Sequence, residues 1–109
     1  MVIAGIFDKY TSEIFKFLGV KTIAIDLEDT NLASKLENLL LELKKDKNIF
    51  AVLISKNISS KTRKEIEDFI LNNSRPAIIE VDPVYKIEKY EDYETIIKRI
   101  VRETIGLKL

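Results

Sequence analysis

The chain has no cysteine and no histidine among its 109 residues. Disulfide bonds are therefore excluded, and so are metal sites built from thiolates or imidazoles. A cysteine nucleophile, a histidine general base and every catalytic triad that contains histidine are excluded as well. The side chains that remain for chemistry are carboxylates, lysines, tyrosines and hydroxyls.

Glycine is scarce. The three glycines are Gly5, Gly19 and Gly106, and none of them forms a GxGxxG or GxxxxGK(S/T) pattern. Without a glycine-rich turn, backbone N–H groups cannot close around a pyrophosphate. The sequence therefore gives no support to nucleotide binding, and we expect no cofactor.

Long apolar runs and an excess of one charge are also missing. No stretch approaches the ~20 apolar residues of a membrane span, and residues 1–4 lack the basic start of a signal peptide. Lysines plus arginines equal aspartates plus glutamates at 18 each, which argues against a general nucleic-acid binder. We expect a soluble, cytoplasmic protein that neither inserts into a membrane nor binds nucleic acid.

Four short apolar runs are present instead. Residues 49–55 form a continuous apolar run of strand length, which is typical of an interior strand of a parallel sheet. Residues 2–7 form a second run of this kind. Residues 20–25 are more mixed, and residues 76–81 begin with proline and contain Glu80, so both are predicted to lie at sheet edges.

Between these runs, apolar residues recur at helical spacing. Thr11 is expected to cap a short helix over residues 12–18, and Gly19 follows where a helix end favours a left-handed residue. A longer amphipathic helix is predicted over residues 32–45. Its buried stripe is expected to be Leu32, Leu36, Leu39, Leu40 and Leu43.

Two more helices are predicted in the second half. Ser59 or Ser60 is expected to cap a third helix with Ile66, Phe69 and Ile70 on its buried face. A loop over residues 83–92 should follow the last strand, and a final helix over residues 93–105 should follow the loop, with Asp92 as its cap.

Strands and helices therefore alternate throughout the chain. This alternation predicts right-handed crossovers and a parallel sheet with helices on both faces. We expect a single α/β domain over residues 1–109 with a globular core over residues 1–82. It should be a three-layer sandwich of the flavodoxin-like or Rossmann-like kind, with four strands in the order 2-1-3-4 and an added C-terminal helix.

Polar residues follow each predicted strand and should meet at the carboxyl edge of the sheet, where ligands bind in such folds. They are Asp8, Asp26, Ser55, Lys56 and Asp82. Several acids at one edge can bind a divalent metal. The simpler interpretation is that polar residues end strands and cap helices, so we expect no metal site.

A phosphorylation switch is the alternative function. A phosphoryl-accepting receiver domain needs an acid at the end of the third strand, where this chain has Ser55, and it has a fifth strand that this chain lacks. Ser55 and Ser59 also resemble the phosphorylated serine of an anti-sigma-factor antagonist. A plain N-cap is the simpler role for Ser59.

The predicted loop carries Tyr85, Ile87, Tyr90 and, at its end, Tyr93 among charged residues. Aromatic residues of this kind are enriched as anchors in protein interfaces. The alternative is that they fold back on the local core.

The whole chain resembles the F subunit of archaeal-type and vacuolar-type ATP synthases and ATPases. Four segments carry the resemblance: the opening strand with its Asp-x-x-Thr turn and Gly-Val step, the third strand and the Lys/Arg/Glu-rich helix after it, a Pro-x-Ile-x-Glu strand, and the final helix with its Gly-hydrophobic tail. They are residues 2–20, 49–70, 75–81 and 96–107. The chain departs from the pattern at Phe7, where the family has glycine, and at Ser55-Lys56, where it has Thr-Glu.

The resemblance implies a non-catalytic subunit of the central stalk, located at the membrane only through the ATPase complex. Its implied partners are the coiled-coil D subunit and the catalytic A and B subunits. The residues that we expect at protein contacts are Asp8, Thr11, Ser55, Lys56, Asn57, Tyr85, Tyr90, Lys98, Arg99, Arg102, Ile105 and Leu107.

Overall fold

The computed structural model describes residues 2–84, 98 and 102. Its elements alternate between strand and helix, apart from two consecutive helices after the third strand. They are β1 (Val2–Phe7), α1 (Lys9–Phe17), β2 (Lys21–Ala24), α2 (Leu32–Lys45), β3 (Ile49–Ser55), α3 (Lys56–Ser59), α4 (Arg63–Asn72) and β4 (Ala77–Val81). The predicted loop 83–92 and helix 93–105 lie outside the described residues, apart from Pro83, Val84, Lys98 and Arg102.

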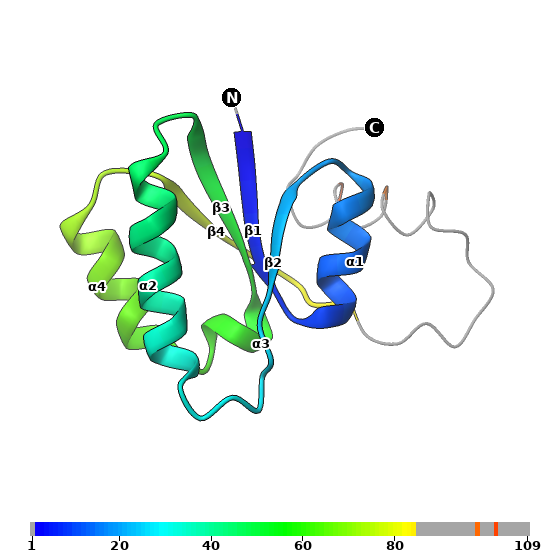
Figure 1. Cartoon of the computed structure of the whole chain (residues 1–109), viewed down its shortest axis with the longest axis horizontal. Helices are drawn as coiled ribbons and strands as arrows, with labels where there is room; N and C mark the ends of the chain where they lie inside the picture. Colours follow the sequence, from blue (N-terminus) through cyan, green and yellow to red (C-terminus); the bar gives the residue numbers. More distant parts are fainter. Residues whose placement is uncertain (1, 85–97, 99–101, 103–109) are drawn as a thin grey trace.

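The four strands form one parallel sheet in the order β2-β1-β3-β4, as predicted (Figure 1). The two most apolar strands, β1 and β3, lie in the middle, where both faces and both edges of a strand are covered. The short strands β2 and β4 lie at the edges. The pairing of β1 with β3 shifts register between Val2 and Ile3, so the regular ladder runs from Ile3 towards the carboxyl edge.

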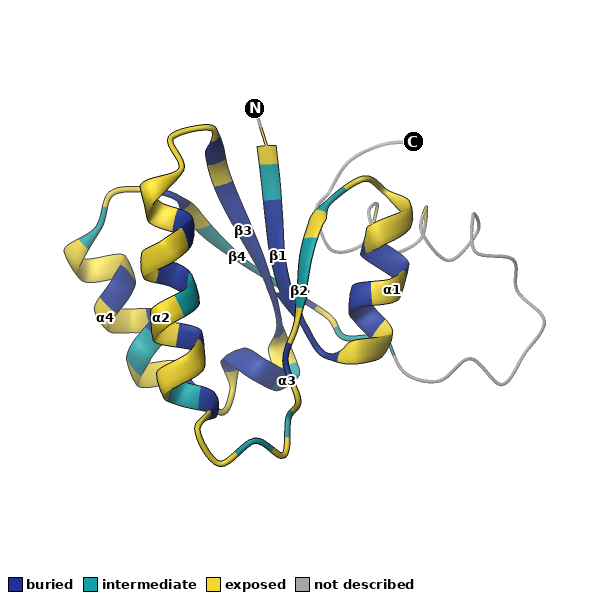
Figure 2. Ribbon diagram, in the orientation of Figure 1, coloured by how far each residue is buried: buried dark blue, intermediate teal, exposed yellow. Residues whose placement is uncertain are grey.

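Helices α2 and α4 cover one face of the sheet, and α1 lies against the other face, beside β1 and β2 (Figure 1). The face under α2 and α4 holds the larger core. Leu32, Leu36, Leu40 and Leu43 are buried there at the predicted helical spacing, whereas Leu39 is half-buried. The buried stripes of α2 and α4 face the sheet, and their exposed residues lie outside (Figure 2).

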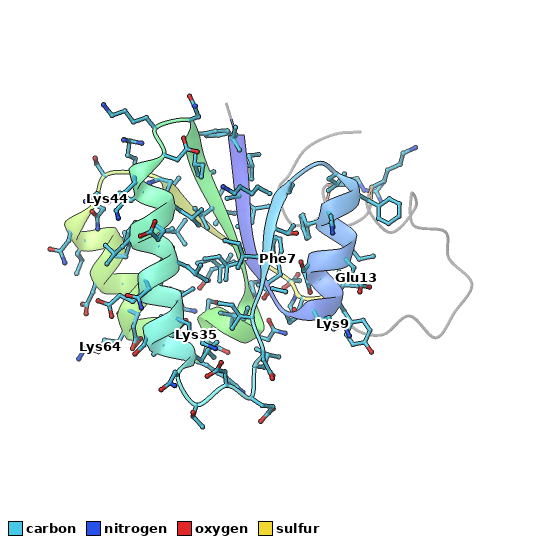
Figure 3. The ribbon with its side chains drawn as sticks, viewed as in Figure 1. Phe7, Lys9, Glu13, Lys35, Lys44 and Lys64 are labelled. Carbon is cyan, nitrogen blue, oxygen red and sulfur yellow. The ribbon has the colours of Figure 1, made fainter. Side chains whose placement is uncertain are left out.

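The core under α1 is small and aromatic. Phe7 and Phe15 are fully buried and stack with their ring centroids 4.6 Å apart. A Cβ at Gly5 would lie 2.2 Å from the Phe7 ring, so the absence of a side chain at Gly5 makes room for this stack. Phe7 lies in the interior, while Lys9 and Glu13 lie on the outer side of α1 (Figure 3). Gly19 has φ 77° directly after α1, which confirms the predicted left-handed residue.

The prediction for the first cap was wrong. Helix α1 begins at Lys9, and Asp8 rather than Thr11 is its N-cap. The backbone of Asp8 is extended, and its carboxylate accepts a hydrogen bond from the Thr11 backbone N–H. An aspartate that ends a strand is already in the backbone conformation that an N-cap needs, so the helix starts one turn earlier.

The third helix also differs from its prediction. It is divided into α3 and α4, and Ser59 and Ser60 do not cap α4; their hydroxyls donate backwards, to the carbonyls of Lys56 and Asn57. Serine hydroxyls can bond to the preceding turn instead of capping the next helix. The predicted burial of Ile66 and Phe69 is confirmed, but Ile70 is 51% exposed.

Candidate interaction site at the carboxyl edge

The carboxyl edge of the sheet is where the chain changes direction between layers. After β1 it enters α1 on one face, and after β3 it enters α3 and then α4, which lies on the other face (Figure 1). In open α/β sheets this switch between neighbouring strands is the usual place for a binding site. The side chains that follow β1 and β3 therefore define the candidate site.

Asp8 is the centre of a hydrogen-bond network at this edge. Its Oδ1 accepts from the Thr11 hydroxyl at 2.7 Å and from Asn57 Nδ2 at 3.1 Å, and its Oδ2 accepts from the Thr11 backbone N–H at 3.3 Å. Asp8 is only 8% exposed and Thr11 is fully buried. The carboxylate thus joins the starts of α1 and α3 across the switch, and its oxygens are occupied by donors from the chain itself.

The residues after β4 complete the network. The backbone N–H of Val84 donates to Thr11 Oγ1 at 2.8 Å. Two residues earlier, Asp82 forms an ion pair with Lys56, with 3.0 Å between Nζ and Oδ1. These contacts join the three loops that follow β1, β3 and β4.

A second ion pair lies next to this edge, between Arg63 of α4 and Glu80 of β4. Burial raises the pKa of Glu80, but the hydrogen bond from Arg63 and the charges of Arg63 and Lys56 outweigh it, so its pKa lies below the ordinary 4.5. Glu80 is therefore a structural carboxylate that stays ionised, which does not suit a general acid.

Two buried polar atoms at the edge have no hydrogen-bond partner. They are the hydroxyl oxygen of Ser55 and the amide oxygen of Asn57. Ser55 is fully buried and pairs in register with Val81 at the end of β4. Native structures rarely leave buried polar atoms without a hydrogen bond, so the hydrogen bonding at this corner of the edge is incomplete.

The structure gives no support to a metal site at this edge. Within residues 2–84, 98 and 102, no group of three acidic side chains is placed to hold a metal ion. Asp82 is neutralised by Lys56, and Asp26 accepts from the backbone N–H of Glu28 at 2.9 Å within its own loop. Both acids make contacts of the kind that polar loop residues commonly make.

Nor does the geometry favour a phosphorylation switch. Ser55 and Ser59 are both fully buried, so a kinase cannot reach either hydroxyl in the folded domain. Both oxygens of the Asp8 carboxylate accept hydrogen bonds from the chain. No described acid stands at the end of β3, where a receiver domain needs one.

The predicted contact residues divide into three groups. Asp8, Thr11 and Ser55 are buried and act within the domain, Asn57 is half-buried, and Lys56 is exposed. Lys98 and Arg102 are exposed. The remaining predicted contact residues lie outside the described part of the chain; they are Tyr85, Tyr90, Arg99, Ile105 and Leu107.

Some partners at this edge were not predicted from the sequence. The bonds from Asn57 to Asp8 and from Val84 to Thr11 join residues far apart in the chain, and the pairs Lys56–Asp82 and Arg63–Glu80 join residues from different elements. The sequence showed only that polar residues follow the strands. This placed the residues at one edge of the sheet but did not identify which of them bond to one another.

The fold and this edge define a class: a single parallel α/β domain whose switch point is filled by its own side chains and has no glycine-rich phosphate loop. Among the described residues, no helix combines the length and the apolar character needed to cross a bilayer. The chain belongs to the ATP synthase (F/14-kDa) subunit family, whose family model matches residues 3–101. This match confirms the resemblance seen in the sequence. Comparison with curated proteins gave no match.

Proposed function

We propose that the protein is a non-catalytic subunit of the central stalk of an archaeal-type or vacuolar-type ATP synthase or ATPase. In this role it binds the coiled-coil D subunit and turns with it inside the ring of catalytic A and B subunits. It is located at the cytoplasmic side of the membrane through the complex and does not itself enter the bilayer. Its contribution is to couple ATP turnover to ion translocation by protein contact.

The family match over residues 3–101 is the observation that carries this proposal. The filled switch between β1 and β3 supports it, because Asp8, Thr11 and Asn57 bond to one another where an α/β enzyme commonly holds its ligand.

The proposed docking surface consists of the exposed residues of the switch region and the C-terminal part of the chain. Lys56, Lys98 and Arg102 are basic and exposed. A surface of this charge fits an acidic stretch of coiled coil, since opposite charges guide the two partners into register and raise the association rate. Lys98 and Arg102 are both exposed residues of the C-terminal part of the chain, so reversing their charges tests the docking.

The test is co-expression of the full chain with its D subunit, followed by size-exclusion chromatography with mass determination. We expect a stable one-to-one complex. The variant Lys98→Glu/Arg102→Glu should weaken binding by about tenfold or more, because each reversal replaces attraction with repulsion.

The matched control is Lys44→Glu/Lys64→Glu, which reverses two exposed lysines on the outer side of α2 and α4 (Figure 3). It should bind like the wild type. Two separate peaks for the wild-type proteins at micromolar concentration would refute the stalk role. Equal weakening by both double variants would refute the docking surface and leave the stalk role standing.

A further inference from the structure

The outer edge of β2 has little protection against pairing with another strand. Within residues 2–84, β2 pairs with β1 alone, in a regular register and at one side of the sheet (Figure 1). Natural edge strands are usually protected by proline, by lysine or by charges that point inward. The opposite edge strand, β4, follows Pro76 and carries Glu80, which pairs with Arg63. In β2 the only residue of this kind is Lys21 at its start, so the second half of the strand is open to pairing.

The backbone at Ala24 points away from the sheet. Ile25 donates its N–H to the Phe7 carbonyl at 2.8 Å, so this N–H faces β1. Successive backbone N–H groups of a strand point to opposite sides, so those of Thr22 and Ala24 point to the outer edge. Ala24 is exposed and its side chain is small, so it does not hinder the approach of another backbone.

Two hollows flank this edge, one on each side of the strand. The α2 hollow, of about 360 Å³, lies between β2 and α2, and Ile23, Ile25 and Leu39 form its apolar part. The α1 hollow, of about 540 Å³, lies between the end of β2 and the start of α1, and its lining includes Tyr10 and Leu27. Successive side chains of an extended chain point to opposite faces, so a strand added beside β2 would direct alternate side chains to the two hollows.

The lining of the two hollows is acidic. It contains five acidic and two basic residues, which are Asp8, Asp26, Glu28, Asp29 and Glu42, and Lys9 and Lys35. Asp26 and Glu28 are exposed and form no ion pair within residues 2–84. Opposite charges favour encounter and fix the register of two partners, so this edge suits a basic segment. A second copy of the chain would bring the same acidic lining against itself.

We propose that the outer edge of β2 is a docking site for an extended, basic segment of a partner protein, which adds to the sheet as a strand. The backbone groups of Thr22 and Ala24 bond to the backbone of this segment. Its alternate apolar side chains fill the α2 and α1 hollows, and its lysines or arginines face Asp26 and Glu28. A small molecule does not suit the site, because the two hollows lie on opposite sides of the strand.

This site is separate from the docking surface proposed for the D subunit. That surface is basic and includes Lys56, which follows β3, whereas the β2 edge is acidic and lies on the far side of β1. The two surfaces therefore select partners of opposite charge. The test below uses the full chain without a D subunit, so its result does not depend on the stalk role.

Selection from a random peptide library displayed on phage tests the proposal, with the full chain as bait and Ala24→Pro for counter-selection. The enriched peptides should alternate apolar residues over about five or six positions, the usual length of a strand, and carry lysine or arginine.

The variant Ala24→Pro removes one outward N–H and places a ring at the edge, while Ile25 can still bond to Phe7. It should weaken the binding of a selected peptide by about tenfold or more. The matched control is Ala24→Ser, which keeps the N–H and should bind like the wild type. Circular dichroism checks that both variants are folded.

A second pair of variants tests the charge. Asp26→Asn/Glu28→Gln should weaken the selected peptide by about threefold or more at low ionic strength, and by less at high salt. An amide at position 26 can still accept the backbone N–H of residue 28. The matched control is Glu13→Gln/Glu37→Gln, because Glu13 lies on the outer side of α1 and Glu37 lines the groove between α2 and α4 (Figure 3). It should bind like the wild type.

Amide hydrogen exchange followed by NMR locates the bound peptide. Exchange at Ala24 should slow by about tenfold or more when the peptide is saturating, because the outward N–H gains a partner. Exchange at Phe69 of α4 should not change. A selected peptide that leaves Ala24 exchange unchanged binds elsewhere and would overturn the proposal.

Three other results would overturn it. The first is a selection that enriches no peptide, or one whose peptides bind the wild type and a folded Ala24→Pro equally. The second is a preference for acidic peptides, which would refute the basic partner. The third is self-association of the wild type that Ala24→Pro abolishes, which would assign the edge to a second copy of the chain. If Ala24→Pro fails to fold, selection on the wild type alone, the charge variants and Ala24 exchange decide the question.

Discussion

The two faces of the sheet are held together by different means. Under α2 and α4, thirteen buried residues form one apolar cluster, while the cluster under α1 has four buried residues among those described. The α1 side has in addition the polar network of Asp8, Thr11 and Asn57. The face with the larger core is therefore stabilised mainly by the amount of apolar surface that it buries. The α1 side is stabilised by a close aromatic stack and a few hydrogen bonds.

This difference matters because the two kinds of contact respond differently to change. An apolar cluster loses stability gradually as atoms are removed, since each methylene contributes separately. Directed hydrogen bonds and a tight stack fail when one partner is removed or one atom is added. Substitutions on the two faces can separate these behaviours.

The largest effect is expected in the large core. Leu36 is fully buried in α2, and Leu36→Ala should lower the free energy of unfolding by about 2–5 kcal/mol, from lost transfer energy and a residual cavity. Urea unfolding followed by circular dichroism measures this loss. Leu41→Ala on the same helix is the control and should cost less than about 1 kcal/mol, because Leu41 is 45% exposed. Equal losses would show that α2 packs through a different face.

An intermediate effect is expected under α1. Gly5→Ala places a Cβ 2.2 Å from the Phe7 ring, and the fully buried ring cannot move without disturbing its stack on Phe15. The variant should be destabilised by about 1–3 kcal/mol, as in other overpacked cores.

The double variant Gly5→Ala/Phe7→Leu tests the cause of that loss. Leucine is smaller than phenylalanine, so the added methyl should cost less in this background than in the wild type. Urea unfolding of both single variants and the double variant gives the coupling. Strict additivity would show that Gly5 and Phe7 do not compete for the same space.

The smallest effect is expected at the Arg63–Glu80 pair. The pKa of Glu80 is lower in the folded state than its ordinary 4.5, so the pair stabilises the fold above pH 4.5 and loses this contribution as the pH falls through the folded-state value. Arg63→Met should cost about 0.2–1 kcal/mol near pH 7, as is usual for partly exposed pairs.

Urea unfolding at several pH values measures this contribution. The difference between wild type and Arg63→Met should shrink as the pH falls from 4.5 through the lower folded-state pKa of Glu80. Arg75→Met is the control, because Arg75 is exposed and forms no ion pair within the described residues. A difference that does not shrink as the pH is lowered through the titration of Glu80 in the folded state would show that Arg63 stabilises by packing rather than by charge.

Much of the fold was predictable because the signals are local. The continuous apolar runs identified β1 and β3 as interior strands, and the leucine spacing identified α2. The errors occurred where a polar side chain had two possible bonds. Thr11 was expected to cap α1, but it donates to Asp8, which is the cap itself, and Ser59 was expected to cap a helix but bonds to the preceding turn. Local sequence does not decide between such alternatives.

The sequence by itself determined the alternation of strands and helices, the parallel sheet and the family, because hydrophobic period and chain order depend only on neighbouring residues. The tertiary structure alone decided the pairing at the carboxyl edge. Asn57 meets Asp8 across 49 positions of the chain, and Val84 meets Thr11 across 73. These contacts form because the crossovers bring the ends of β1, β3 and β4 to one edge, and a hydrogen bond requires that placement to within a few tenths of an ångström.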